Sequence, residues 1–189
     1  MNNFLSFIKR NHPLSTNSFK ELSDILVVKN CTAKTILSEK GKIPQNFYFL
    51  KSGIARAYLI NQKGNEYTRH IYFEGNIVGA FVALIKNKAA LYTIECLTDC
   101  KVIECDYLKL SQLSNKYIDI AILNRKILEL LFSVAVNRNI DFLTLNTTKR
   151  YLKLKKQIPD IDNLVSQKII ASHLATTTVQ LSRIRRSLL

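Results

Sequence analysis

The segment 164–188 reads LVSQKIIASHLATTTVQLSRIRRSL. Its apolar residues recur at helical spacing on either side of a short interruption, which predicts two short helices, 166–174 and 177–188, joined by a very tight turn. Ser166 is placed to cap the first of them. Two short helices in this arrangement are typical of a helix-turn-helix, in which the second helix lies in the major groove of DNA.

The outer face of the second predicted helix has the chemistry of a DNA reader. We expect its inner face to carry Val179, Ile184 and Leu188, with Leu181 beside them. Arginine donates two hydrogen bonds to guanine, glutamine pairs with adenine, and hydroxyls hold phosphates. Together with Ser166, the predicted DNA-binding residues are therefore Thr177, Thr178, Gln180, Ser182, Arg183, Arg185 and Arg186.

Charge is concentrated in the same part of the chain. The formal net charge is +14, and residues 149–189 hold nine Lys or Arg against only two Asp. Such a balance indicates a polyanionic partner. A basic helix is expected at 147–157, where sequence-independent attraction to the DNA backbone would come from Lys149, Arg150, Lys153, Lys155 and Lys156. The alternative is a small helical subdomain with a solvated basic face.

A long helix is predicted between about residues 107 and 145, which contain no Gly or Pro. Its apolar residues follow 3-4 spacing and form a stripe too wide for one small barrel to cover. We therefore expect part of the stripe to meet a second copy of the chain. The predicted dimerisation residues are Ile120, Leu123, Ile127, Leu130 and Val134. The alternative is a helix that packs only on its own domain.

Upstream, the pattern predicts short strands. Two helices, 3–10 and 15–28, are expected first, broken by His12-Pro13. From Cys31 to Cys105, short apolar runs alternate with turn residues, which favours an antiparallel barrel or sandwich. The predicted runs are 35–37, 47–50, 54–60, 67–73, 77–82, 92–97 and 101–105.

Four motifs in this order resemble the Crp/Fnr superfamily of bacterial regulators: GKIPQNFYFLKSGIARAY (41–58), FEGNIVG (73–79), LTDCKV (97–102) and LSRIRR (181–186). The last is similar to the recognition helix of short members common in Bacteroidetes. The resemblance implies an α+β fold with a jelly-roll, cyclic-nucleotide-binding-like sensor domain and N-terminal helices in 1–108. A dimerisation helix would occupy 109–145, and a helix-turn-helix domain 146–189.

The resemblance also assigns roles to single residues. Arg183 matches a base-contacting arginine, and Thr178 lies at another contacting position. Ala175 stands where the turn usually has a glycine, at a position that often takes a left-handed backbone. That backbone costs alanine about 1 kcal/mol.

The effector pocket implied by the resemblance comprises Gly75, Ile77, Val78, Gly79, Ala80, Ala90 and Leu91. The family's cyclic-nucleotide site needs a glutamate where this chain has Ala80 and an arginine where it has Ala90. No arginine occurs between Arg69 and Arg125. Without a guanidinium the cyclic phosphate loses its bidentate partner, and Lys86 and Lys88 are expected to be solvated. Classical cyclic-AMP binding is therefore not expected, and the effector is another molecule or none.

No cofactor or catalytic role is expected. An iron–sulfur cluster needs about four thiolates. Cys96, Cys100 and Cys105 are separated by three and four residues, but no cysteine precedes Cys31, and Cys96 in its strand is expected to point into the core. The three histidines His12, His70 and His173 are scattered, which argues against haem, and each is expected to be a surface or turn residue. A metal-dependent cupin would need several histidines in the strands, where only His70 occurs.

The expected partners are double-stranded DNA, a second copy of the chain and an unidentified small effector, with RNA polymerase as an open further partner. The start of the chain lacks a secretory signal, and no apolar stretch of about 18 residues exists, so no membrane is expected. The prediction is a cytoplasmic homodimer with reduced thiols. The alternative is a sensor module that acts through protein partners rather than DNA.

Overall fold

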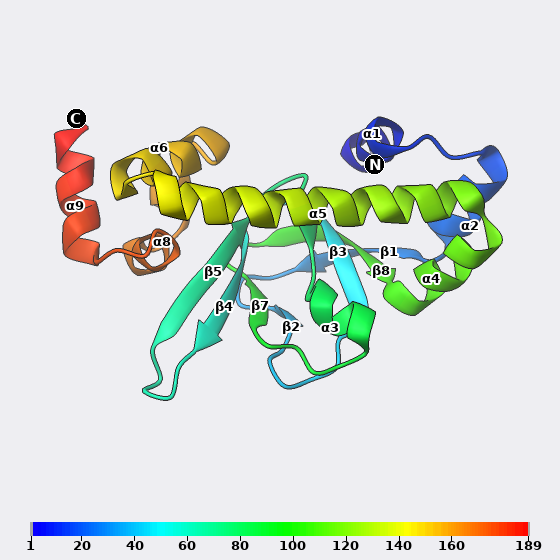
Figure 1. Cartoon of the computed structure of the whole chain (residues 1–189), viewed down its shortest axis with the longest axis horizontal. Helices are drawn as coiled ribbons and strands as arrows, with labels where there is room; N and C mark the ends of the chain where they lie inside the picture. Colours follow the sequence, from blue (N-terminus) through cyan, green and yellow to red (C-terminus); the bar gives the residue numbers. More distant parts are fainter. Residues whose placement is uncertain (1, 189) are drawn as a thin grey trace.

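A computed structural model describes residues 2–188 of the chain. Two antiparallel four-stranded sheets lie beneath one long helix, with the N-terminal helices at one end of that helix and the C-terminal helices at the other (Figure 1). The first sheet has the order β1 (Leu26–Cys31), β8 (Cys100–Asp106), β3 (Asn46–Ser52), β6 (Ile77–Val78). The second has the order β2 (Ile36–Ser38), β7 (Thr93–Cys96), β4 (Ala55–Ile60), β5 (Glu66–Tyr72).

The two sheets enclose a small apolar core. Leu50 from the first sheet and Ala55 and Ile94 from the second are fully buried there, and Val78 and Val102 complete it. Alternate residues along each strand face this core, as period-2 side chains must. The α+β fold with an N-terminal jelly-roll domain, a long helix and C-terminal helices is thereby confirmed.

A second core lies on the outer face of the first sheet. The helices α1 (Asn2–Asn11), α2 (Thr16–Asp24) and α4 (Tyr107–Lys116) cover this face, together with the first half of α5 (Ile118–Thr144). Phe7 and Leu22 pack there against Phe49 and Ile103. Asp119 fixes α2 to the start of α5, because it accepts hydrogen bonds from Ser18 Oγ at 2.6 Å and from the N–H of Ser15 at 2.9 Å.

Three predicted element boundaries were wrong. The expected helix 15–28 ends at Asp24, because the β-branched Val27 and Val28 pair with β8 as part of β1. The expected strand 77–82 ends at Val78, and α3 (Phe81–Lys86) follows. The expected single helix 107–145 is broken at Tyr117, whose φ of −125° and ψ of 115° are extended.

The long helix α5 is apolar on two opposite faces. Ile120, Leu123 and Ile127 are buried against the chain's own α1, β3 and β8 region, so the prediction that these three lie on a dimer surface is wrong. Their 3-4 spacing marks the stripe that α5 presents to its own core. Of the predicted dimer residues, only Leu130 and Val134 are exposed.

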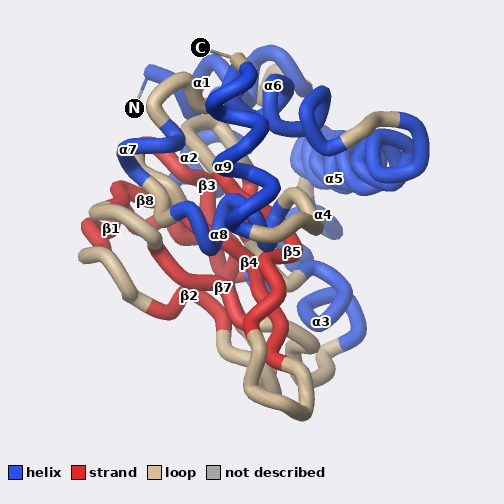
Figure 2. The backbone as a smooth tube through the Cα atoms, turned by 90° about the vertical axis from the view of Figure 1, so that its left-hand side faces the viewer, coloured by secondary structure: helices blue, strands red, loops and turns tan. Residues whose placement is uncertain are grey.

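Four helices form the C-terminal end: α6 (Thr147–Gln157), α7 (Ile161–Leu164), α8 (Gln167–His173) and α9 (Thr178–Ser187). They stack beside the sandwich (Figure 2). Their buried residues include Tyr151, Ile161, Ile170 and Leu181, and the cluster continues into Ile71 of the sandwich. The N–H of Thr68 in β5 donates to Ser172 Oγ in α8 at 2.8 Å, so the two parts of the chain are directly joined.

Candidate nucleic-acid interface

The start of helix α9 is held by a capping box. Thr177 Oγ1 accepts the N–H of Gln180 at 3.1 Å, and Gln180 Oε1 accepts the N–H of Thr177 at 3.3 Å. Gln180 Oε1 also accepts the hydroxyl of Thr176 at 2.7 Å. A capping box satisfies two helix-end donors reciprocally. Both residues belong to the predicted DNA-contacting set, and in the structure Thr177 Oγ1 and Gln180 Oε1 are engaged in starting the helix.

The exposed face of α9 forms a shallow groove with the start of α8. Its lining comprises Gln167, Thr178, Val179, Ser182, Arg183 and Arg186. Gln167 Nε2 donates to the carbonyl of Thr178 at 2.8 Å and ties the two helices together. Arg183 and Arg186 are exposed, and neither has an ion-pair partner within residues 2–188. Free guanidiniums beside hydroxyls on one helix face can reach both base edges and phosphates.

Val179 belongs to this outer face, although the sequence assigned it to the inner one. Its side chain is 59% exposed, whereas Leu181 is fully buried. The two residues are about 200° apart around a helix, so they cannot both face inward. Leu188 is also exposed, and Ile184 is half-buried. An exposed apolar side chain among these polar groups suits contact with the methyl group of thymine.

Arg185 is a further residue of α9 whose environment differs from the sequence prediction. Its guanidinium donates to Asp162 Oδ1 in α7, and its side chain is largely covered. Asp162 also accepts the Tyr151 hydroxyl at 2.5 Å and pairs with Lys155 at 3.2 Å. Arg185 thus holds α9 onto α6 and α7. The intrachain contact, rather than DNA, accounts for its position.

Replacing Asp162 by asparagine is expected to destabilise the C-terminal helices by about 1–3 kcal/mol, because Arg185 would lose its charged acceptor. Burial raises the pKa of Asp162, but the hydrogen bonds from Tyr151 and Lys155 and the charge of Arg185 outweigh it, and the pKa is lowered. Its contribution is therefore present at neutral pH and lost as pH falls through the folded-state pKa. Urea unfolding at pH 7 and in acid measures both effects. An equal loss for Asp160→Asn, at an exposed neighbour, would contradict this role.

The turn between α8 and α9 has the expected left-handed residue. Ala175 has a φ of 52°, which confirms the sequence prediction for this position. The chain reverses here with the N–H of Ala175 donating to the carbonyl of Ser172 at 3.1 Å. Ser166 lies at the N-cap of α8, but its side chain makes no capping hydrogen bond and is exposed, which leaves its hydroxyl free for another acceptor.

Replacing Ala175 by glycine is expected to stabilise the protein by about 0.5–1 kcal/mol, because glycine adopts a positive φ without the steric cost that alanine bears. The matched control is Ala135→Gly in the interior of α5, where glycine costs about 1 kcal/mol. Urea unfolding at neutral pH measures both variants. The prediction fails when the two substitutions shift the free energy of unfolding in the same direction.

The basic helix α6 divides into structural and exposed cations. Arg150 donates to the carbonyls of Leu145 at 2.7 Å and Leu174 at 3.0 Å, so it joins the ends of α5 and α8. Lys153 pairs with Asp141 at 2.5 Å. Lys149 and Lys156 are exposed. Sequence-independent attraction to a polyanion therefore falls mainly to these two lysines.

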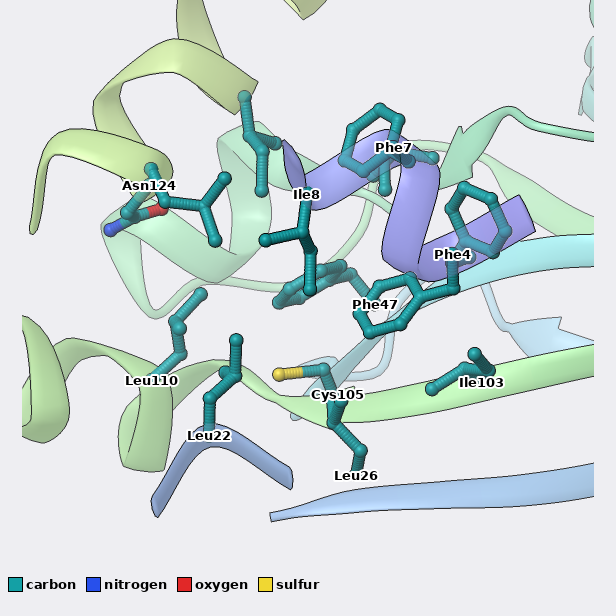
Figure 3. Close-up of a pocket in the computed structure, with 14 residues that line it drawn as sticks. Phe4, Phe7, Ile8, Leu22, Leu26, Phe47, Ile103, Cys105, Leu110 and Asn124 are labelled. Atoms are coloured by element: carbon teal, nitrogen blue, oxygen red, sulfur yellow. The ribbon is translucent and has the colours of Figure 1, made fainter. Parts of the chain in front are cut away.

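The predicted effector-pocket residues lie in several different environments. Val78 is buried between the sheets, and Ile77 lines an apolar pocket on the helical side whose labelled residues include Phe4, Phe7, Phe47 and Asn124 (Figure 3). Ala80 and Ala90 are buried against Ala83 and Tyr92, whereas Leu91 is 69% exposed and Gly75 lies in a turn with a φ of 86°. Small side chains thus pack together at positions 80 and 90.

The backbone at Gly79 lies very close to the side chain of Phe47. A Cβ atom at Gly79 would lie 2.9 Å from Phe47 Cβ, so only glycine fits without a shift of neighbouring atoms. Helix α3 begins two residues later, directly after Ala80. Lys86 and Lys88 are exposed, as the sequence indicated.

The cysteines and the histidines lie in different parts of the structure. Cys96 and Cys100 are buried between the sheets, whereas Cys105 belongs to the cluster under α1. Within residues 2–188, no group of three His, Cys, Asp or Glu side chains is placed to hold a metal ion. The histidines His70 and His173 were expected at the surface or in turns. They instead face each other between β5 and α8, with ring centroids 6.2 Å apart.

Comparison with known proteins shows which proteins this chain resembles. Residues 28–117 match the family model of the cyclic nucleotide-binding domain. A search of curated protein sequences finds no relative. Among the helices that the structure describes, none is long and apolar enough to cross a membrane.

Solved structures extend the similarity to nearly the whole chain. FixK2 from Bradyrhizobium japonicum matches with a TM-score of 0.70 at 13% identity, over 87% of this chain and 84% of that one. The c-di-GMP-responsive global regulator CLP of Xanthomonas campestris matches with 0.68 at 15%, over 92% and 91%. A protein from Eubacterium rectale assigned to the Crp/Fnr family of transcriptional regulators matches with 0.70 at 18%, over 92% and 83%. The resemblance predicted from the sequence is confirmed at the level of the fold.

Proposed function

We propose that this chain is a DNA-binding transcriptional regulator of the Crp/Fnr type. The observation that carries the proposal is the outer face of α9, where Thr178, Val179, Ser182 and Arg183 lie together and no acidic residue pairs with Arg183 within the described chain. A helix with this face, joined to the preceding helix by Gln167, has the side chains that a recognition helix uses in the major groove. The proposed site of action is the cytoplasm.

The proposed contact set follows from exposure. Thr178, Val179, Ser182 and Arg183 would read base edges, and Arg186, Ser166 and the exposed lysines of α6 would hold phosphates. Thr177, Gln180 and Arg185 stay outside this set because they serve the helix ends and the contact with α7. The proposed division of labour is a sensor domain at 1–108, a dimerisation helix at 109–145 and a DNA-binding domain at 146–189.

We further propose that the protein acts as a homodimer through the outer face of α5. Phe132, Val136 and Ile140 follow one another at intervals of four residues, and Leu143 continues the row. All four are exposed and lie about opposite the stripe that packs on the chain's own core. A helix that is apolar on both faces normally buries both. Two-fold symmetry would present two copies of α9 to successive major grooves.

The jelly-roll domain would not bind cyclic AMP in the family's usual way. Ala80 and Ala90 are buried in a small apolar cluster, so neither a carboxylate nor a guanidinium is available there for ribose and phosphate. Contact with RNA polymerase stays a prediction of the family resemblance.

The proposal is tested by selecting genomic fragments with the purified full-length protein at ~150 mM salt, where nonspecific binding is weak. We expect enrichment of a two-fold symmetric site whose half-sites are about one helical turn apart. Enrichment of no distinct site, with and without added cell extract, would contradict the proposal and favour a module that acts through protein partners.

A further inference from the structure

A cleft separate from the expected effector region lies where the sensor sandwich, the long helix and the C-terminal helices meet. It encloses about 250 Å³ and is bounded by the last third of α5, by α6, by α8 and by β5. Figure 1 shows these elements converging at the C-terminal end of α5. The side chains that bear on the argument are His70, Arg138, Asp141, Arg150, Lys153 and His173. None of the predicted effector residues lines this cleft.

Arg138 is a largely buried cation without an acidic partner. Its guanidinium lies over the ring of Phe142 at 5.4 Å, and no ion pair or hydrogen bond joins it to another described residue. Its Nε atom is shielded from solvent and unsatisfied. Burial and the nearby charge of Arg69 lower the pKa of Arg138 to about 10. Buried charges are normally paired, so this site lacks a negative charge.

His173, on the opposite side of the cleft, also has a buried polar atom without a partner. Its Nδ1 atom is buried and has no hydrogen-bond partner among the described residues. Buried polar side-chain atoms nearly always have a partner. Burial and the positive charge of Arg138 lower the pKa of His173 to about 3, and burial with Arg138 and Arg69 does the same for His70. Both imidazoles are therefore neutral at pH 7, and each has one N–H to donate.

The remaining charges leave the cleft positive. Asp141 is the only acidic residue in its lining, and its carboxylate is paired with Lys153 Nζ at 2.5 Å. Arg150 donates to the carbonyls of Leu145 and Leu174 through its two terminal nitrogens, while its buried Nε has no hydrogen-bond partner among the described residues. Donors thus converge from α5, α6, α8 and β5. The oxygens of a tetrahedral anion also point in several directions, so such an anion can accept from donors on different elements at once.

We infer that this cleft binds a phosphate group, either free or carried by a small molecule. Arg138 would supply the charged hydrogen bonds, and His173 would donate or accept one more at its unsatisfied nitrogen. Such a ligand would contact the sensor strand β5, the dimerisation helix and α8 at once. The inference concerns ligand binding and holds whether or not α9 binds DNA. Under the proposed function, it places an effector directly against the helix-turn-helix.

The full-length protein is titrated with inorganic phosphate and with pyrophosphate, against chloride at matched ionic strength, while the histidine side-chain signals are followed by NMR. The chain has three histidines, so His12, outside the cleft, is an internal control. We expect the signals of His70 and His173 to move saturably and that of His12 to stay. A response to pyrophosphate alone would indicate that the ligand carries more than one phosphate.

Two variants locate the site. Arg138→Gln is expected to weaken binding at least tenfold, since a charged hydrogen bond is lost. Arg183→Gln removes a cation from the exposed face of α9 and is expected to leave the affinity unchanged. The inference is overturned when neither probe moves the His70 and His173 signals of the wild-type protein at millimolar concentration. Retention of wild-type affinity by Arg138→Gln, or its loss in Arg183→Gln, would overturn it equally.

Discussion

Replacing Arg183 by alanine is expected to abolish enrichment of the selected DNA site. Arg183 is exposed on α9 between Val179 and Arg186, and its guanidinium is free of ion pairs within residues 2–188. A bidentate contact to guanine discriminates by about 1–3 kcal/mol, and a dimer would lose it at both half-sites. The expected loss of affinity therefore lies between roughly thirtyfold and twenty-thousandfold. Fluorescence anisotropy with a labelled duplex measures it.

The matched control is Arg125→Ala. Arg125 is also an exposed arginine, but it lies on α5 and pairs with Glu129 at 2.5 Å. It carries the same charge as Arg183 and no expected contact with DNA. An equal loss in both variants would show that net charge alone drives binding. An unchanged affinity in Arg183→Ala would remove the assignment of α9 as the reading helix.

Val179 offers a second, smaller test of how α9 would read its site. An exposed valine beside free guanidiniums has no stabilising role in the chain's own core, because Leu181 occupies that place. Replacing Val179 by serine is expected to leave stability within about 0.5 kcal/mol and to relax the preference at one base pair. Repeating the fragment selection with this variant shows whether a thymine preference is lost at one position of each half-site. An unaltered sequence preference would contradict the contact.

The C-terminal unit could be predicted from sequence because short helices with caps carry local signals. The bounds of α6 and the outer position of Arg183 follow from residues within a few positions of each other, whereas the left-handed backbone at Ala175 is an expectation from the family resemblance. Which residues of α9 are engaged inside the chain could not be predicted. Arg185 pairs with Asp162, which lies 23 positions away in the sequence, and that contact exists only once α7 has packed.

The long helix α5 shows more clearly what the sequence alone does not predict. A 3-4 pattern marks an apolar stripe, but the pattern does not say what covers it. Ile120, Leu123 and Ile127 meet α1 and the first sheet, which come from much earlier in the chain. The second stripe, from Phe132 to Leu143, begins where those N-terminal elements no longer cover the helix. The cleft near Arg138 was missed for the same reason, because its residues come from four separate elements.

Replacing Phe132 by aspartate is expected to dissociate the proposed homodimer into monomers. Phe132 is 71% exposed at the start of the apolar row on the outer face of α5, with Val136 one turn further along. A two-fold interface would bury this side chain twice, and each burial contributes about 1.5–3 kcal/mol. Aspartate would lose that contribution and would also bring two like charges together. The dissociation constant of the dimer should rise at least about a hundredfold, as measured by sedimentation velocity.

Leu108→Asp in α4 is the control, because Leu108 is 67% exposed and lies away from the outer face of α5. It makes the same change of chemistry at nearly the same exposure, so a general effect of a new surface charge would appear in both variants. If only Phe132→Asp dissociates and also loses the two-fold symmetric DNA site, the outer face of α5 brings the two reading helices together. If both variants stay dimeric, the second copy must dock elsewhere, and the exposed row from Phe132 to Leu143 must bind another partner.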